Sequence, residues 1–152
     1  QFDLPYIPIS TLAELQEAYD WLISDDEEAA EYETVALDSI SEIAETILNS
    51  EKKINKDPRA AYGAMQEQIA DVIRSFRDIP NKHVYMSAKQ DRQIDGNGAV
   101  LFQPDMPGKT MTQQVPYFFD EVFAMVLTPG EPGQRAHATR QVVERLASAA
   151  GR

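Results

Sequence analysis

A single carboxylate directly follows a short apolar run in this sequence. The run Thr34–Leu37 is compact and contains β-branched residues, and it ends at Asp38 and Ser39. A carboxylate at the end of an apolar strand can hold Mg²⁺, often through water, and the metal can then bridge phosphate oxygens. The same Asp38-Ser39 pair can also cap a helix that begins at Ile40. Both interpretations stay open, and they are compatible with each other.

Polar residues follow a second apolar run in the same way. Residues 83–88 predict a strand, and Lys89 and Gln90 come directly after it. A cationic or amide side chain at the end of a neighbouring strand can sense a terminal phosphate. The alternative is that these two residues only begin an exposed loop.

The segment 89–114 is long, polar and rich in Gly and Pro, so we expect a loop there. Loops of this length in compact domains tend to be functional or mobile. Arg92 and Lys109 give it local positive charge, so residues 92–112 can contact a partner such as single-stranded nucleic acid. Phe102 is the only aromatic residue between Arg92 and Thr112, which leaves few stacking platforms. A connecting loop without a binding role is the alternative.

Composition excludes several classes of protein. The 152 residues fit one domain, and 14 Lys and Arg against 25 Asp and Glu give a net charge of −11. Such a fold is a poor binder of polyanions, although a local basic loop can still touch nucleic acid. The chain has no cysteine, which excludes disulfides and thiolate catalysis. No apolar run approaches the roughly 20 residues of a membrane span, so we expect no membrane partner and a cytoplasmic location.

Other motifs do not support a site. His83 and His137 have no second ligand at metal-binding spacing, so a transition-metal site is not expected. Gly108-Lys109-Thr110 is similar to the end of a phosphate-binding loop, but the first glycine of that motif is missing and no strand precedes it. We therefore reject it as a phosphate cradle.

The remaining elements follow from periodicity and turn signals. Four helices are predicted, and the one over 58–76 has the longest apolar stripe in the chain. Tyr117–Phe119 and Phe123 are expected to pack in the core because they adjoin a strand. The predicted elements are a ragged edge strand within 4–9, a helix over 11–23, a helix from Ile40, a helix over 58–76, a third strand over 122–127 and a helix over 137–150.

This alternation of strands and helices predicts an α/β fold with a mainly parallel sheet. The run 34–37 has no polar alternation, which is typical of an interior strand covered on both faces. Ligands of such sheets bind beyond the carboxyl ends of the strands. Asp38 and Lys89 both fall at such ends, and this coincidence is the main argument for a site.

A series of segments, in the same order along the chain, resembles RecA-like P-loop ATPases. The relatives in question are phage-type nucleotide-binding proteins related to phage single-strand annealing recombinases. No one motif decides the match, but the ordered set is fairly specific and covers about residues 7–126. The segments are Tyr32–Glu45, Asp57–Gly63, Phe76–Pro80, Val84–Lys89, Met106–Lys109 and Pro116–Phe123.

The resemblance implies a partial RecA-like three-layer sandwich that binds ATP and Mg²⁺. Asp38 would be the Walker B carboxylate and metal ligand, with Ser39 as its neighbour in the cofactor site. Lys89 and Gln90 would lie at the phosphate-sensing strand end, and the loop 92–112 would meet single-stranded DNA. The implied role is phage DNA recombination or replication in the cytoplasm of a bacterial host cell, with a homo-oligomer as a further possibility.

Two departures from the family pattern affect this expectation. The family's Walker A loop and an upstream catalytic carboxylate precede the first strand seen here, and the sequence contains no Walker A motif. Residues 134–152 also diverge from the closing strand that the family pattern predicts. We therefore expect a single domain over 1–152 whose last part, 134–152, is a divergent tail. We therefore expect weak or absent ATP hydrolysis by this chain alone. A non-catalytic α/β interaction module in a phage assembly is the rival hypothesis.

Overall fold

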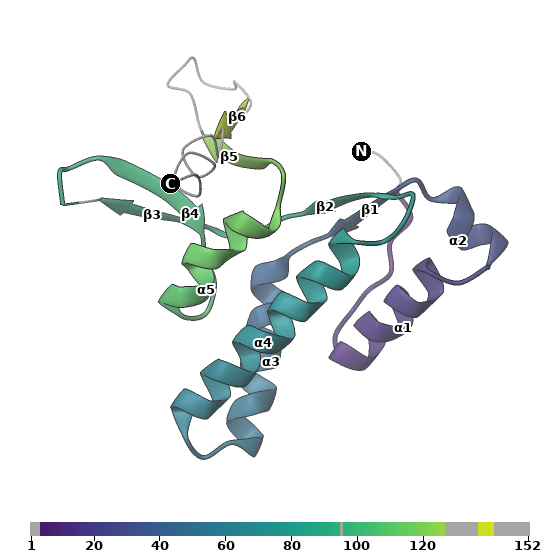
Figure 1. Cartoon of the computed structure of the whole chain (residues 1–152), viewed down its shortest axis with the longest axis horizontal. Coiled ribbons are helices and arrows are strands. Elements are labelled where there is room, and N and C mark those ends of the chain that lie inside the picture. The colour runs from purple at the N-terminus through teal and green to yellow at the C-terminus, as the bar shows by residue number, and fades with distance from the viewer. Residues whose placement is uncertain (1–3, 95, 127–136, 142–152) are drawn as a thin grey trace, which may run out of the picture.

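The computed structural model describes residues 4–94, 96–126 and 137–141. The helices and strands are shown in Figure 1. The first half contains α1 (Leu12–Leu22), α2 (Glu27–Glu31), β1 (Thr34–Leu37), α3 (Ile40–Ile54), α4 (Pro58–Arg77) and β2 (His83–Met86). The second half contains β3 (Gln90–Ile94), β4 (Val100–Pro104), α5 (Lys109–Gln114), the 3₁₀ helix η1 (Val115–Phe118), β5 (Val122–Val126) and β6 (His137–Gln141).

Local capping explains where the N-terminal helices begin. Thr11 and Glu14 form a reciprocal capping box at the start of α1, in which the Glu14 amide donates to the Thr11 hydroxyl at 3.2 Å. Asp57 caps α4, and Pro58 occupies its first turn, where a missing amide hydrogen costs nothing. The predicted helices over 11–23 and 58–76 are confirmed.

The two strands predicted to carry the site form a parallel pair. β1 and β2 align Thr34 with His83 and Leu37 with Met86. The connection between them runs through α3 and α4, which lie side by side beneath the pair (Figure 1). The prediction of parallel strands with helical crossovers is therefore confirmed for this pair.

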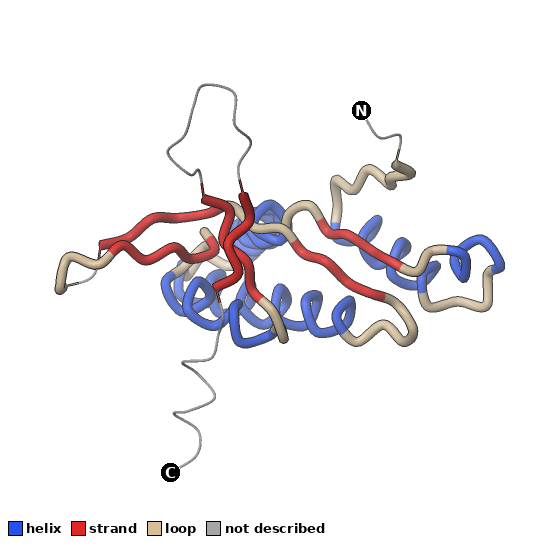
Figure 2. Tube along the Cα trace, turned by 90° about the horizontal axis from the view of Figure 1, so that it is seen from above, coloured by secondary structure: helices blue, strands red, loops and turns tan. Residues whose placement is uncertain are grey.

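Only one face of the β1–β2 pair is covered within the described residues. Leu37, Val84 and Met86 pack toward the helices, whereas Tyr85 on the opposite face is 59% exposed. Figure 2, which views the molecule from above, shows this face uncovered. The expectation that the 34–37 strand is covered on both faces is wrong here, because no element among the described residues packs on the face that carries Tyr85.

The core lies between α3 and α4. Ile47 of α3 and Met65, Ile69 and Ile73 of α4 have no exposed surface. Met111 and Val115, at α5 and η1, complete the same cluster from the second half of the chain. This packing fixes the C-terminal elements on the helix pair that connects β1 to β2.

The segment predicted as one long loop is mostly regular structure. β3 and β4 form an antiparallel hairpin that pairs Gln90 with Pro104, and α5 follows it. The hairpin extends away from the helices (Figures 1 and 2). β3 was missed because it is polar and mostly exposed, so no apolar alternation marks it. β4 was missed although it begins with the apolar residues Val100, Leu101 and Phe102, because the segment around it is rich in Gly and Pro.

Three further expectations need correction. Residues 4–9 form no strand. The third predicted strand is present as β5, but it pairs antiparallel with β6, which occupies the start of the helix predicted over 137–150. Leu127 and residues 142–152 of these predictions lie outside the described residues. In β6, pairing with the preceding strand β5 overrides a weak local pattern.

The aromatic cluster is only partly in the core. Phe118 and Phe119 pack against the buried cluster, whereas Tyr117 is 63% exposed and Phe123 is 49% exposed. The core prediction is therefore wrong for Tyr117 and Phe123. A 3₁₀ helix turns Tyr117 outward, and sequence position beside a strand does not reveal that turn.

Candidate functional site

Asp38 and Ser87 meet at the carboxyl ends of two adjacent parallel strands. The ladder continues one residue beyond the strands, where the Ser87 amide donates to the Leu37 carbonyl at 3.0 Å. This places the Ser87 hydroxyl beside Asp38, and it donates a hydrogen bond to the Asp38 carboxylate. The carboxylate itself is exposed to solvent. The predicted strand-end position of Asp38 is thus accompanied by a hydroxyl that orients it.

Ser39 begins helix α3, as the capping interpretation predicted. Its hydroxyl accepts a hydrogen bond from the Glu42 amide at 3.4 Å. The Ile40 amide at the start of the helix donates to the Ser87 carbonyl at 2.9 Å, and the Asp38-Ser39 peptide bond is cis. Ser39 therefore acts as the helix cap, while Asp38 is turned toward Ser87.

Lys89 is held by two carboxylates on the first turns of α3. Its Nζ lies 2.5 Å from Glu42 Oε1 and 3.0 Å from Glu45 Oε1. The hydrogen bonds that Lys89 donates to Glu42 and, to a lesser extent, to Glu45 raise its pKa from 10.5 to about 12. Lys89 is therefore a full cation at neutral pH, and any phosphate that approached it would compete with these two carboxylates.

Ser41 ties the end of β2 to the base of the hairpin. Its side chain is fully buried, donates to the Asp105 carbonyl at 2.7 Å and accepts from the Lys89 amide at 3.0 Å. The Asp105 amide in turn donates to the Lys89 carbonyl at 2.7 Å. One buried hydroxyl thus sets where Lys89 leaves the sheet and where β4 ends.

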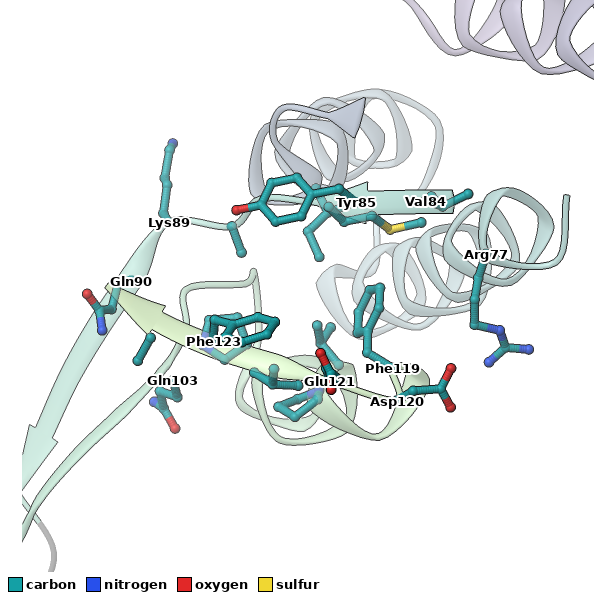
Figure 3. Close-up of a pocket in the computed structure, with 18 of the residues that line it drawn as sticks. Arg77, Val84, Tyr85, Lys89, Gln90, Gln103, Phe119, Asp120, Glu121 and Phe123 are labelled. Atoms are coloured by element: carbon teal, nitrogen blue, oxygen red, sulfur yellow. The ribbon is translucent and has the colours of Figure 1, made fainter. Parts of the chain in front are cut away.

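The other predicted site residues lie on separate elements. Gln90 begins β3 and lines a cleft beside β2, which is shown in Figure 3. Arg92 lies further along β3, and Lys109 begins α5; both are exposed. Asp38 is not among the residues that line the cleft. Lys89 lines this cleft together with Gln90. The structure therefore brings Asp38 to Ser87 and Lys89 to Glu42 and Glu45, and no contact joins Asp38 to Lys89 among the described residues. Arg92 and Lys109 are set apart on the hairpin and on α5.

The donor set at the carboxyl edge of the β1–β2 pair suits a hard cation with few protein ligands. Mg²⁺ is usually held by one or two carboxylates together with waters and phosphate oxygens. Asp38 supplies one such carboxylate, and the Ser87 hydroxyl adjoins it. Within the described ranges, no group of three or more His, Cys, Asp or Glu residues could hold a metal. A metal here would thus depend on a phosphate ligand, as in nucleotide sites.

Comparison with protein families matches residues 3–150 to a model described as an AAA domain. The chain belongs to the AAA domain family. Because AAA domains are P-loop NTPases, this is a nucleotide-binding, P-loop ATPase-like domain. The search of curated proteins and the search of solved structures give no match.

Two residues of this AAA domain were not singled out from the sequence. Ser87 follows the second strand as Asp38 follows the first, so strand register alone would have paired them. Ser41 carries no such signal, because its partners Lys89 and Asp105 are 48 and 64 residues away in the chain.

The rejected glycine motif has a conformational role in this AAA domain. Gly108 has a φ of +88° and precedes α5. This backbone conformation favours glycine, because side chains with a Cβ rarely adopt it. Space does not require glycine, since a Cβ there would make only ordinary van der Waals contact with the ring of Tyr62 on α4, at 3.4 Å.

None of the helices described here is both long and apolar enough to span a bilayer.

Proposed function

We propose that this AAA domain binds ATP with Mg²⁺ at the carboxyl edge of the β1–β2 pair, as part of a RecA-like ATPase core. The observation that supports this most strongly is the meeting of Asp38 and Ser87 at the ends of adjacent parallel strands. We also propose that residues 1–152 form one domain with a three-layer sandwich fold. Residues 134–152 are a divergent tail of this domain.

Each site residue has a distinct role in this proposal. Asp38 holds the metal, oriented by the Ser87 hydroxyl, and Ser39 fixes the start of α3 beside the cofactor. Mg²⁺ neutralises charge on the phosphates when it is bound. Lys89 and Gln90 sense the terminal phosphate, and Lys89 exchanges its carboxylate partners for phosphate oxygens. Such an exchange would couple nucleotide to the hairpin, because Lys89 and Asp105 are joined through their backbones.

Calorimetric titration of Mg-ATP tests the site directly. We expect measurable binding heat for the native chain and at least about tenfold weaker binding for Asp38→Ala and Asp38→Asn, because each removes the only charge that Asp38 offers the metal. Asp71→Asn is the matched control, since Asp71 is an exposed carboxylate on α4 whose ion pair is with Arg74, three residues away on the same helix. Its affinity should equal that of the native chain.

Equal affinity of the native chain and Asp38→Asn would contradict the site. If the native chain shows no binding heat at millimolar ATP, the result instead favours the second candidate, a non-catalytic interaction module. That candidate draws on the uncovered face of the β1–β2 pair, where Tyr85 is 59% exposed. We expect slow or no ATP hydrolysis in either case, because the sequence contains no Walker A motif to cradle the phosphates.

We further propose that the segment 92–112 contacts single-stranded DNA during phage recombination or replication in the cytoplasm of a bacterial host, with a homo-oligomer as the working form. Arg92 and Lys109 are exposed, and no ion pair to either is found among the described residues. Cations and carboxylates are equal in number between 89 and 112, so any contact must be local rather than driven by net charge.

The salt dependence of DNA binding tests this segment. Arg92→Ala and Lys109→Ala should each weaken binding of an oligo-dT strand, and each should reduce the slope of log K against log salt by roughly 0.7. Lys56→Ala is the control, because Lys56 is an exposed cation in the α3–α4 connection, away from the hairpin (Figure 1). If the slope is unchanged in both Arg92→Ala and Lys109→Ala, these two residues do not contact the phosphates.

A further inference from the structure

Asn97 and Gly98 lie next to each other at the tip of the β3–β4 hairpin. The last pair of the ladder joins Ile94 to Val100, so the residues between these two form the turn. Asn97 and Gly98 are both exposed, and the hairpin extends away from the helices (Figures 1 and 2). The pair therefore stands in solvent, at the kind of loop tip where the backbone is most accessible.

The backbone amide that follows an asparagine can attack the asparagine side chain. The nitrogen of the next residue loses its proton and forms a bond to the side-chain carbonyl carbon, Cγ. The bond from Cγ to the side-chain nitrogen then breaks, and this nitrogen leaves as ammonia. Water opens the resulting cyclic imide at either carbonyl, which gives an aspartate or an isoaspartate. Water is the only co-reactant, and the rate depends on how easily the nitrogen and Cγ approach each other.

Glycine after the asparagine removes the main steric obstacle to this attack. A Cβ on the attacking residue would crowd its nitrogen, and glycine has none. No described atom lies within 4 Å of the point where a Cβ would stand on Gly98. Gly98 also has a φ of +82°, which favours glycine on conformational grounds alone. The turn therefore retains glycine at the position that makes Asn97 reactive.

The other three asparagines of the chain lack this arrangement, because serine or lysine follows each of them. Asn49 lies within α3, where the next amide is held by a helical hydrogen bond. Asn55 ends the same helix, and its side-chain amide donates to Glu51 Oε2 at 2.7 Å. Asn81 is exposed on the connection from α4 to β2 and is followed by Lys82. It is therefore the closest internal comparison for Asn97.

We propose that Asn97 is a modification site, at which spontaneous deamidation through Gly98 adds a carboxylate to the tip of the hairpin. Cations and carboxylates are equal in number between 89 and 112, so the reaction makes this segment net negative. A negative tip repels a polyanion. The modification therefore weakens the contact of this segment with single-stranded DNA, a consequence that rests on the DNA contact proposed above.

Peptide mapping by mass spectrometry measures the modification in the whole chain. The chain is held in mildly alkaline buffer, which favours loss of the amide proton, and samples taken over time are digested with trypsin. Cleavage after Arg92 and Lys109 releases a fragment whose only asparagine is Asn97. Its conversion from amide to acid should be at least about tenfold faster than the conversion of Asn81. The proposal is wrong if Asn97 reacts no faster than Asn81.

Two glycine substitutions in the same turn separate attack by Gly98 from general exposure. Gly98→Ala places a Cβ beside the attacking nitrogen and should slow the conversion of Asn97 at least about tenfold. Gly96→Ala is the matched control, since Gly96 lies in the same turn, with no described atom within 4 Å of its Cβ position, but does not follow Asn97. Asn97 should react at the native rate in this control. Equal rates in the native chain and Gly98→Ala would contradict the proposal.

The affinity for an oligo-dT strand measures the consequence of the added charge. Asn97→Asp carries the carboxylate of the product and should bind at least about twofold more weakly at low salt, with a difference that shrinks as salt rises. Asn81→Asp makes the same charge change outside the hairpin and should bind as the native chain does. Equal affinities of these two variants would show that the added charge does not act on the contact. If the native chain does not bind oligo-dT, the proposed DNA contact is wrong, whereas the mass measurement still decides whether Asn97 is modified.

Discussion

Replacing Ile69 with alanine is expected to lower the free energy of unfolding by about 2–5 kcal/mol. Ile69 lies at the centre of α4, has no exposed surface and belongs to the cluster that joins α3, α4, α5 and η1. Its truncation removes apolar contacts and leaves a cavity that the two long helices cannot close without moving apart. Chemical denaturation followed by circular dichroism measures the loss.

The same substitution at the end of α3 provides the control. Ile54 is 76% exposed, so Ile54→Ala should change the free energy of unfolding by no more than about 0.5 kcal/mol. Similar losses at the two positions would show that the α3–α4 contact is not the main source of stability. Since this contact also carries η1, the Ile69→Ala variant should loosen the β5 side of the cleft in Figure 3 as well.

Replacing Ser41 with alanine is expected to cost about 1–3 kcal/mol, although it deletes a single oxygen atom. The hydroxyl is fully buried and bonds both to the Asp105 carbonyl and to the Lys89 amide. Without it, a donor and an acceptor from distant segments lose their shared partner in a site that water does not reach. Denaturation measures the loss, and faster exchange of the Lys89 amide locates it.

Ser75 offers a matched serine-to-alanine control on the exposed surface of α4. Ser75→Ala should leave stability unchanged or raise it slightly, because alanine is the better helix former. Suppose that Ser41→Ala and Ser75→Ala have the same free energy of unfolding, and that the Lys89 amide exchanges at its native rate in Ser41→Ala. Ser41 then does not anchor the hairpin. The anchor would then have to be the bond from the Asp105 amide to the Lys89 carbonyl.

Elements with strong local signals were predictable from the sequence. The capping residues Thr11 and Asp57 and the apolar stripe of α4 determine helices by contacts within a few residues. The strand 34–37 is marked by its abrupt end at Asp38, and its parallel partner was expected from the helices between the two strands. For the same reason the position of Asp38 directly after β1 was predictable, whereas β2 ends at Met86 and Lys89 lies directly before β3.

Elements that become strands through pairing with the next strand of the chain were not predictable. β3 is polar and mostly exposed, so its pairing with β4 rather than its own pattern makes it a strand. β6 lies where a weak apolar stripe favoured a helix, and its pairing with β5 decided otherwise. The exposure of Phe123 depends on η1, whose turn leaves that side chain in the cleft rather than in the core.

The sequence by itself therefore determined the helices α1, α3 and α4, the parallel strand pair and the strand-end carboxylate, because these follow from short-range periodicity, capping and chain connectivity. Only the tertiary structure decided that the Ser87 hydroxyl orients Asp38, that Glu42 and Glu45 hold Lys89, and that Ser41 joins segments 64 residues apart. These contacts arise where side chains from separate segments meet, and no local pattern encodes such meetings.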